Sequence, residues 1–306
     1  MYHTRAMRYG GSRLATAFLL LASVNARAQT TPPPPAALDW SADDGRRVGE
    51  LTAKGERREG TMVVLFTPPG ALEDSEEAAL LQRLDKGVAE LRAVVGRHSW
   101  QVMREPKITY YISLDRFVSH ASGRGAVFIP LLRVQDGRAP YLHEAGHELL
   151  ATFSQPVTPD PARFERTRVT RPLWLGEGLA DYVAQTAATR AGVKEGDVFD
   201  IGGLAGADAA CRDRVKGPRG AEILPFIGAV GAPEALFTTE RMEVAPTFYA
   251  CGTSFTKFLV GRIGLQETIS LMPLILKDGV LARIEELTGK KMEIIRGEWR
   301  AAIGIQ

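Results

Sequence analysis

The hydrophobic pattern of this chain changes from strand-like to helix-like about midway along its length. Three short runs rich in β-branched and apolar residues predict strands at 61–67, 107–114 and 125–134. Between the first two runs, apolar residues recur at helical spacing over 76–95 and predict a helix. After Arg138, helical periodicity dominates to the last residue. This order of elements predicts an α+β fold, with a small N-terminal β-sheet followed by a mainly helical C-terminal part.

The same pattern predicts how the chain is organised. Residues 29–60 are Pro-rich and then charged, which is typical of a linker and a poorly packed lead-in. We expect one folded domain at 61–306, in which 61–154 hold the sheet and the helix of a candidate active site. A Pro-rich loop then leads to a helical subdomain at 172–306. Further helices of this subdomain are predicted at 246–263, 267–276, 279–287 and 292–303.

The first 28 residues have the three-part pattern of a secretory signal peptide. Four arginines and no acidic residue accompany an apolar run at 14–24, and Ala26 and Ala28 supply the small residues of a cleavage site. The run is too short for a membrane span, which needs about 20 apolar residues. We therefore predict cleavage after Ala28, export to the periplasm or the extracellular space, and no stable membrane anchor afterwards.

Removal of the signal changes the charge of the chain. The full sequence carries 38 − 36 = +2, and loss of the four signal arginines leaves 34 − 36 = −2. No basic tract with interleaved aromatic residues remains, so nucleic acid is not an expected partner.

Cys211 and Cys251 are the two cysteines of the chain. In an exported protein they meet an oxidising compartment, which favours a disulfide over two unpaired buried thiols. Neither cysteine lies in a CxxC or metal-ligand spacing.

The candidate chemistry begins at 143–147, His-Glu-Ala-Gly-His, an HExxH motif within a segment of helical periodicity. Positions i and i+4 share one face of a helix, so His143 and His147 can bind the same metal ion. Glu144 lies beside that face and suits a general base that does not itself bind the metal. Gly146 is a poor helix former and leaves room for another element to approach closely.

Two glutamates compete for the place of a third metal ligand. Glu165 follows His147 by 18 positions, but it lies in a charged stretch without an apolar face. Glu177 follows His147 by 30 positions within PLWLGEGLADY, a second predicted amphipathic helix. One turn later, Asp181 can accept the remaining N–H of a ligating imidazole, and Glu165 has no such partner. This difference favours Glu177. Phe153 occupies the position at which a metzincin carries its third histidine, so the sequence excludes the metzincin class.

HEAGH followed by WLGEGLADY resembles the gluzincin superfamily of zinc metallopeptidases, and in particular the peptidase MA-like proteins with their W-L-x-E-G-x-A-x-Y segment. The resemblance implies a zincin-like fold and one Zn²⁺ per chain, held by His143, His147 and Glu177, with Glu144 as general base. It extends weakly to TMVVLF, to TFYACGTSFTKFLVGRIG and to a late EWR. The 29-residue interval between His147 and Glu177 departs from the family pattern.

The implied ligand set predicts a zinc-dependent metallopeptidase. Two histidines and one glutamate leave Zn²⁺ with an open position for water, whose pKa the metal lowers towards about 7. Glu144 can take the proton of that water, and the substrate is then a peptide or protein. The alternative is a non-catalytic, zinc-bound exported module that binds a peptide or cell-wall partner in the same cleft. A metal-free helical binding protein is a third hypothesis.

The sequence leaves two further questions open. A donor is needed to stabilise the developing oxyanion, and Tyr249, Tyr182, His98 and His120 are all candidates. The strand segment 125–130 precedes the HExxH helix, so we expect it to form the cleft edge and to bind substrate by strand addition.

Overall fold

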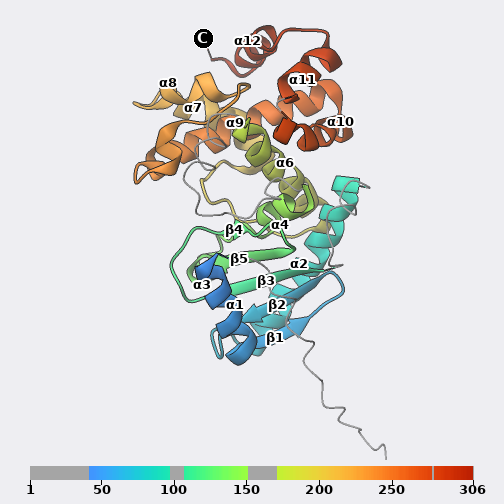
Figure 1. Cartoon of the computed structure of the whole chain (residues 1–306), viewed down its shortest axis with the longest axis vertical. Coiled ribbons are helices and arrows are strands. Elements are labelled where there is room, and N and C mark those ends of the chain that lie inside the picture. Colours follow the sequence, from blue (N-terminus) through green and yellow to red (C-terminus); the bar gives the residue numbers. More distant parts are fainter. Residues whose placement is uncertain (1–40, 97–106, 151–170, 278, 306) are drawn as a thin grey trace, which may run out of the picture. The chain divides into compact units, whose positions relative to one another are not determined.

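The N-terminal part of the folded chain contains a five-stranded mixed sheet with the order β1-β2-β3-β5-β4 (Figure 1). The computed structural model describes residues 41–96, 107–150, 171–277 and 279–305, which fall in the unit Leu38–Gln306. Strands β2, β3 and β5 run parallel, and β1 and β4 are antiparallel to their neighbours. With the helices that follow, this confirms the α+β class. The strands are β1 (Glu56–Glu59), β2 (Val63–Thr67), β3 (Ile108–Ser113), β4 (His120–Ala121) and β5 (Ala126–Pro130).

The two faces of the sheet contribute to two different cores. Tyr110 and Ile112 of β3 join the main core, which also contains the apolar face of α2 (Asp74–Val95). Tyr111, between them in the chain, joins a smaller core with α1 (Ala42–Lys54), as the alternation of side chains along a strand requires. On this second face, a row of stacked rings crosses four strands, with neighbouring centroids 5.2, 5.3 and 5.1 Å apart. The stacked rings are those of Phe66, Tyr111, Phe128 and His120.

The prediction that 29–60 are a linker and a poorly packed lead-in is wrong for residues 41–59. These residues fold as the helix α1 and the strand β1. Val48 and Leu51 are three positions apart on α1 and are buried, while most of its charged residues face outward. The Ser41 hydroxyl accepts the backbone N–H of Asp44 at 3.1 Å and caps this helix. The charged strand β1 is tolerated because it pairs with β2 alone, at the edge of the sheet. The high charge of this segment is therefore compatible with an amphipathic helix, which the sequence analysis did not predict.

The third predicted strand, 125–134, ends earlier than expected. Pro130 closes β5, and Leu131–Gln135 forms the short helix α3. Proline has no N–H for the next ladder bond, which is a physical reason for this boundary. Strand β5 also pairs with β3 on one side and with β4 on the other, so it is not an edge strand. The expectation that 125–130 form the cleft edge is therefore wrong. The strand at this edge of the sheet is β4.

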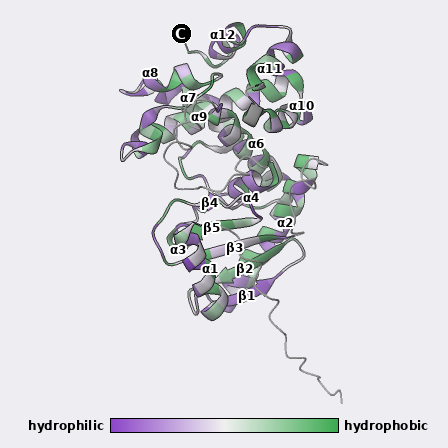
Figure 2. Ribbon diagram, in the orientation of Figure 1, coloured by the Kyte–Doolittle hydropathy of each residue, from purple (hydrophilic) through white to green (hydrophobic). Residues whose placement is uncertain are grey.

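Helices dominate the described chain after the sheet, and Figure 2 shows hydrophobic and hydrophilic residues on each of α1, α2 and α12. The helix predicted at 246–263 begins earlier, at Arg241. Pro246 therefore lies in its second turn and does not mark its start. The helices α7 and α8 were not predicted from the sequence. The helices are α4 (Tyr141–Leu150), α6 (Leu173–Ala191), α7 (Gly203–Arg214), α8 (Gly220–Ile223), α9 (Arg241–Ile263), α10 (Leu265–Ser270), α11 (Val280–Thr288) and α12 (Met292–Ile303), with 3₁₀ turns at Leu224–Phe226, Glu234–Phe237 and Met272–Lys277.

Helix α6 packs against α4 and α9 at positions where small residues allow the backbones to approach. A Cβ atom added at Gly178 would lie 2.4 Å from the Gly252 carbonyl oxygen of α9 and 2.4 Å from the Thr256 hydroxyl. A Cβ atom at Gly146 of α4 would lie 3.4 Å from the Ala180 carbonyl oxygen of α6. The close approach predicted at Gly146 is confirmed, and the tighter contact is the one at Gly178.

Cys211 of α7 and Cys251 of α9 form a disulfide, with their Cα atoms 4.7 Å apart. Both residues are buried in the main core. The pairing favoured by the sequence is thus present in the structure, and it ties α7 to the helix that lines the candidate site.

Among the described helices, none is by itself both long and apolar enough to cross a membrane. The pair Arg241–Ile263 and Leu265–Ile275 passes that test jointly, and it is bent by 115° at its junction.

The Gly178 contact predicts that Gly178→Ala destabilises the fold by about 1–3 kcal/mol, because the added methyl group overpacks the crossing of α6 and α9. Urea unfolding followed by circular dichroism measures this change. Gly261→Ala is the matched control on α9, where a Cβ would meet nothing within 4 Å. There the better helix propensity of alanine should stabilise by up to about 1 kcal/mol. Equal changes in unfolding free energy for the two substitutions would contradict overpacking at the crossing of α6 and α9.

Candidate metal centre

Helix α4, which carries the HExxH motif, is buried along its whole length and is held at both ends by carboxylates. At its start, Glu195 accepts the backbone N–H groups of Leu142 and His143 at 2.9 and 3.1 Å. At its end, Glu148 accepts two backbone N–H groups of the β4–β5 turn, both at 2.7 Å. These contacts fix the position of the helix relative to the sheet and to the loop after α6.

The roles of Glu195 and Glu148 have no signal in the sequence. Their backbone partners lie 23 or more positions away in the chain, beyond the reach of any local pattern. Burial raises the pKa of Glu195 to about 8 and that of Glu148 to about 7, although the hydrogen bonds from backbone N–H groups oppose the shift.

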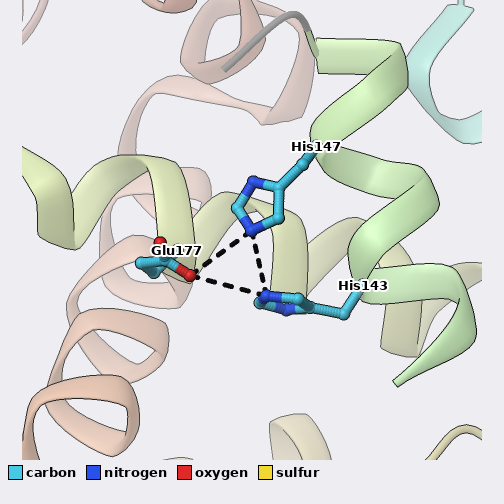
Figure 3. A group of neighbouring side chains, drawn as sticks. All are labelled: His143, His147 and Glu177. Atoms are coloured by element: carbon cyan, nitrogen blue, oxygen red, sulfur yellow. Dashed lines mark hydrogen bonds and ion pairs between the residues drawn. The ribbon is translucent and has the colours of Figure 1, made fainter. Parts of the chain in front are cut away.

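The structure brings His143, His147 and Glu177 together, as Figure 3 shows. The two imidazole Nε2 atoms are 3.0 Å apart. The Glu177 carboxylate oxygen from α6 lies 3.3 Å from the Nε2 atom of His147 and 3.5 Å from that of His143. Tetrahedral zinc ligands, bound at about 2.0–2.1 Å, lie about 3.3 Å from one another. The triangle of donor atoms therefore has the size that a zinc ion requires.

Asp181 fixes the orientation and the tautomer of the His143 ring. Its Oδ1 atom lies 2.6 Å from Nδ1 of His143, and its Oδ2 atom accepts the Thr253 hydroxyl at 2.7 Å. Because a carboxylate accepts and does not donate, Nδ1 carries the proton of a neutral His143 ring. Its Nε2 atom then presents a lone pair to the point between His147 and Glu177, as a metal ligand must.

The charges at the centre favour a cation. Burial on its own lowers the pKa of His143, but the adjacent carboxylates, chiefly Asp181, outweigh it and raise that pKa well above its ordinary value. Burial on its own raises the pKa of Glu177, but the imidazoles of His147 and His143 hold it well below its ordinary range. Two nitrogen donors and a carboxylate oxygen are the donor set of catalytic zinc sites. Donor set, spacing and charge together fit Zn²⁺.

Glu144 lines a pocket whose wall also includes His143, one of the three donor residues. The pocket has a volume of about 690 Å³, its open mouth included. Burial raises the pKa of Glu144, and the imidazoles of His143 and His147 oppose that shift. No hydrogen bond to the Glu144 carboxylate is found among the described residues, so it is available to a group in the pocket. The wall also includes Asp181, Tyr249, Thr253, Arg133 and Arg241.

Of the four candidates for stabilising an oxyanion, Tyr249 lies at the site. Its ring centroid is 6.1 Å from that of His143, and it lines the pocket. Burial, the charge of Glu177 and a hydrogen bond to Glu177 raise the pKa of Tyr249, so the hydroxyl keeps its proton. Tyr182 does not line the pocket. His98 and the rejected ligand candidate Glu165 lie outside the described residues.

His120 has a different task, because its ring joins β4 to α1. Its Nε2 atom lies 3.1 Å from both carboxylate oxygens of Asp44, and its Nδ1 atom lies 2.9 Å from the Val118 carbonyl oxygen. The ring also stacks on Phe128. Burial lowers the pKa of His120, but the hydrogen bond with Asp44 outweighs it and raises the pKa above its ordinary value.

A second group of carboxylates, Glu56, Asp74 and Glu77, is also close enough to hold a metal ion. Arg58 donates hydrogen bonds to both Asp74 and Glu77, and so already supplies the positive charge there. This group therefore does not compete with the site on α4.

The contact between Asp181 and His143 predicts that Asp181→Asn lowers zinc affinity about 10- to 100-fold, because the amide no longer selects the correct tautomer. Competition with a fluorescent chelator measures the affinity. The control is Asp136→Asn, a change at an exposed position of the loop after α3. An unchanged affinity in Asp181→Asn would show that Asp181 does not support the ligand.

The pair of Asp44 and His120 predicts a pH-dependent contribution to stability. The Asp44 pKa is lowered from 3.8, so its contribution is present above that pH and is lost as the pH falls. The His120 pKa is raised from 6.5, so its contribution is present below that pH and is lost as the pH rises through the folded-state value. Asp44→Asn should therefore cost more unfolding free energy at pH 5.5 than at pH 8.5. Urea unfolding at both values checks this, and an equal cost would contradict it.

Comparison with known proteins returns distant structural neighbours. No family model and no curated protein matches the chain. A conserved protein of unknown function from Bacillus anthracis str. Ames matches with a TM-score of 0.41 and 13% identity, over 87% of this chain and 55% of that one. A mutant of a functionally unknown conserved protein from the same strain gives 0.40 and 14%, with the same coverage. This chain thus spans about half the length of the structures that it matches.

Proposed function

We propose that this protein is an exported, zinc-dependent metallopeptidase of the gluzincin type, with a zincin-like arrangement of sheet and helices. The observation that carries the proposal is the convergence of His143, His147 and Glu177 at zinc-ligand spacing, with Asp181 fixing one imidazole. Glu144, the residue next to the first histidine, faces the adjoining pocket and supplies the carboxylate that a hydrolase needs.

The chemistry follows from the residues around the pocket. When bound, a zinc ion held by His143, His147 and Glu177 supplies a Lewis acid and lowers the pKa of water. Glu144 then accepts a proton from the attacking water and returns it to the leaving amine nitrogen. Its burial suits the first task, because a raised pKa makes the Glu144 carboxylate a stronger base towards the proton of the water. Tyr249 keeps its hydroxyl proton and can donate a hydrogen bond to a developing oxyanion.

The edge of the sheet offers a place for the substrate backbone. Val118 and Ser119 immediately precede β4 and line the pocket. Strand β4 pairs with β5 on one side, and its other side is the sheet edge. An extended peptide can add there as a further strand, which brings its carbonyl groups beside Glu144. This replaces the segment 125–130 as the expected docking strand.

Export is supported by two features. The first 28 residues have a signal-peptide pattern, and the disulfide between Cys211 and Cys251 is of the kind that persists in oxidising compartments.

The alternative is a non-catalytic zinc-bound module that binds a peptide or cell-wall partner. Structural zinc sites usually close with four protein ligands, whereas the group found among the described residues has three. A buried Glu144 beside the pocket also costs free energy that a purely structural site would not need. Both observations favour the peptidase.

The test is made on the mature chain with Glu144→Gln. This variant should keep about one zinc per chain and lose peptide cleavage by a factor of about 100 or more, because the proton acceptor is gone. Elemental analysis measures zinc, and a library of fluorogenic peptides measures kcat/KM. A wild-type protein that holds zinc and cleaves no peptide would contradict the peptidase and favour the zinc-bound module.

The ligand assignment is tested in parallel by comparing two glutamates. Glu177→Gln should lose zinc, because a carboxylate ligand becomes a weakly binding amide, whereas Glu165→Gln should retain it. The reverse result would assign the third ligand to Glu165.

A further inference from the structure

Two arginines of the pocket wall have no acidic partner among the described residues. Arg133 lies on α3 and Arg241 is the first residue of α9, and both are half-buried at the pocket. Within the part of the chain that the structure describes, the Arg133 side chain makes no hydrogen bond or ion pair. Arg241 makes one long contact there, from its Nη2 atom to the Tyr249 hydroxyl at 3.4 Å.

The acids that adjoin Arg241 in the chain are already taken by another arginine. Arg219 donates to Glu240 at 2.6 Å and to Glu243 at 2.9 Å, in addition to its bonds with Glu222. These three carboxylates bind Arg219, and none of them forms an ion pair with Arg241 in the described part of the chain.

The acids that line the pocket also have their own donors. Asp181 accepts from His143 and from Thr253. Asp197 accepts the backbone N–H groups of Ile201 and Gly202 at 2.8 and 2.7 Å, which fixes it within its own loop. Glu144 is assigned to the attacking water. Within the described ranges, no acidic side chain thus pairs with either guanidinium group, and both are available to a ligand in the pocket.

A guanidinium group half removed from water is best satisfied by a planar anion, which it binds with two parallel hydrogen bonds. The N-terminus of α9, where Arg241 lies, adds the positive end of a long helix dipole. We propose that Arg133 and Arg241 bind a carboxylate of the substrate, so that the pocket selects peptides with an acidic group next to the scissile bond. This inference rests on the proposed peptidase and names its substrate class.

Such a carboxylate has two sources, a free C-terminus or an Asp or Glu side chain. Three peptides of otherwise identical sequence distinguish them: a neutral peptide with a C-terminal amide, the same peptide with a free C-terminus, and an amidated peptide with a glutamate. The wild-type enzyme should cleave one of the two acidic peptides with a kcat/KM about tenfold or more above that of the neutral amide. The preferred acidic peptide identifies the source.

The arginines are tested by the ratio of kcat/KM for the preferred acidic peptide to that for the neutral amide. This ratio should fall towards one in Arg133→Gln and Arg241→Gln, and Arg133→Lys should retain part of it because the charge remains. Arg190→Gln, on an exposed turn of α6 away from the pocket, is the matched control and should keep the wild-type ratio. A wild-type ratio near one, or a ratio that survives both glutamine variants, would overturn the inference while leaving the peptidase intact.

Binding separates this inference from a failure of the peptidase. Calorimetry on Glu144→Gln measures the affinity for the same three peptides without turnover. A preference for an acidic peptide that is lost when Arg133→Gln and Arg241→Gln are added supports the anion site, even if the wild-type protein cleaves nothing. Equal affinity for the neutral amide and both acidic peptides overturns it.

Discussion

The close packing of α6 between α4 and α9 is the constraint on which the candidate centre depends. Helix α4 brings two imidazoles, α6 brings the Glu177 and Asp181 carboxylates, and α9 brings the Thr253 hydroxyl and the Tyr249 ring. These groups meet because Gly178 lets the backbones of α6 and α9 approach to a distance at which a methyl group does not fit. The geometry of this three-helix centre therefore depends on small residues at the helix crossings, such as Gly178 and Gly146, which are not themselves part of it.

Buried acidic side chains at this centre are stabilised by hydrogen bonds and by neighbouring imidazoles. Glu195 and Glu148 hold the two ends of α4, and Asp181 orients an imidazole while accepting the Thr253 hydroxyl. Burial of so many carboxylates costs free energy unless each has donors or a neighbouring positive charge. A divalent cation bound between the two imidazoles and Glu177, as we propose, would supply that charge where the carboxylates gather.

The convergence of His143, His147 and Glu177 could be predicted from local patterns. The i, i+4 histidines, the glutamate between them and the one-turn spacing of Glu177 and Asp181 are all properties of single helices, which the sequence displays directly. The strands at 61–67 and 107–114 were also predicted closely, because each is a short apolar run. The missed features depend on partners far away in the chain. The helix α1 appeared too charged to pack, and the role of Glu195 at the start of α4 has no local signal.

X-ray absorption at the zinc edge tests the account most directly, on the mature chain purified without added metal. We expect about one zinc per chain, with four nitrogen or oxygen neighbours at about 2.0–2.1 Å, of which two belong to imidazoles and one to solvent. Loss of one imidazole contribution in His147→Gln would assign the metal to α4. A sulfur neighbour at about 2.3 Å, a third imidazole, or a protein that takes up no zinc would contradict the claim that His143, His147 and Glu177 form an open metal centre.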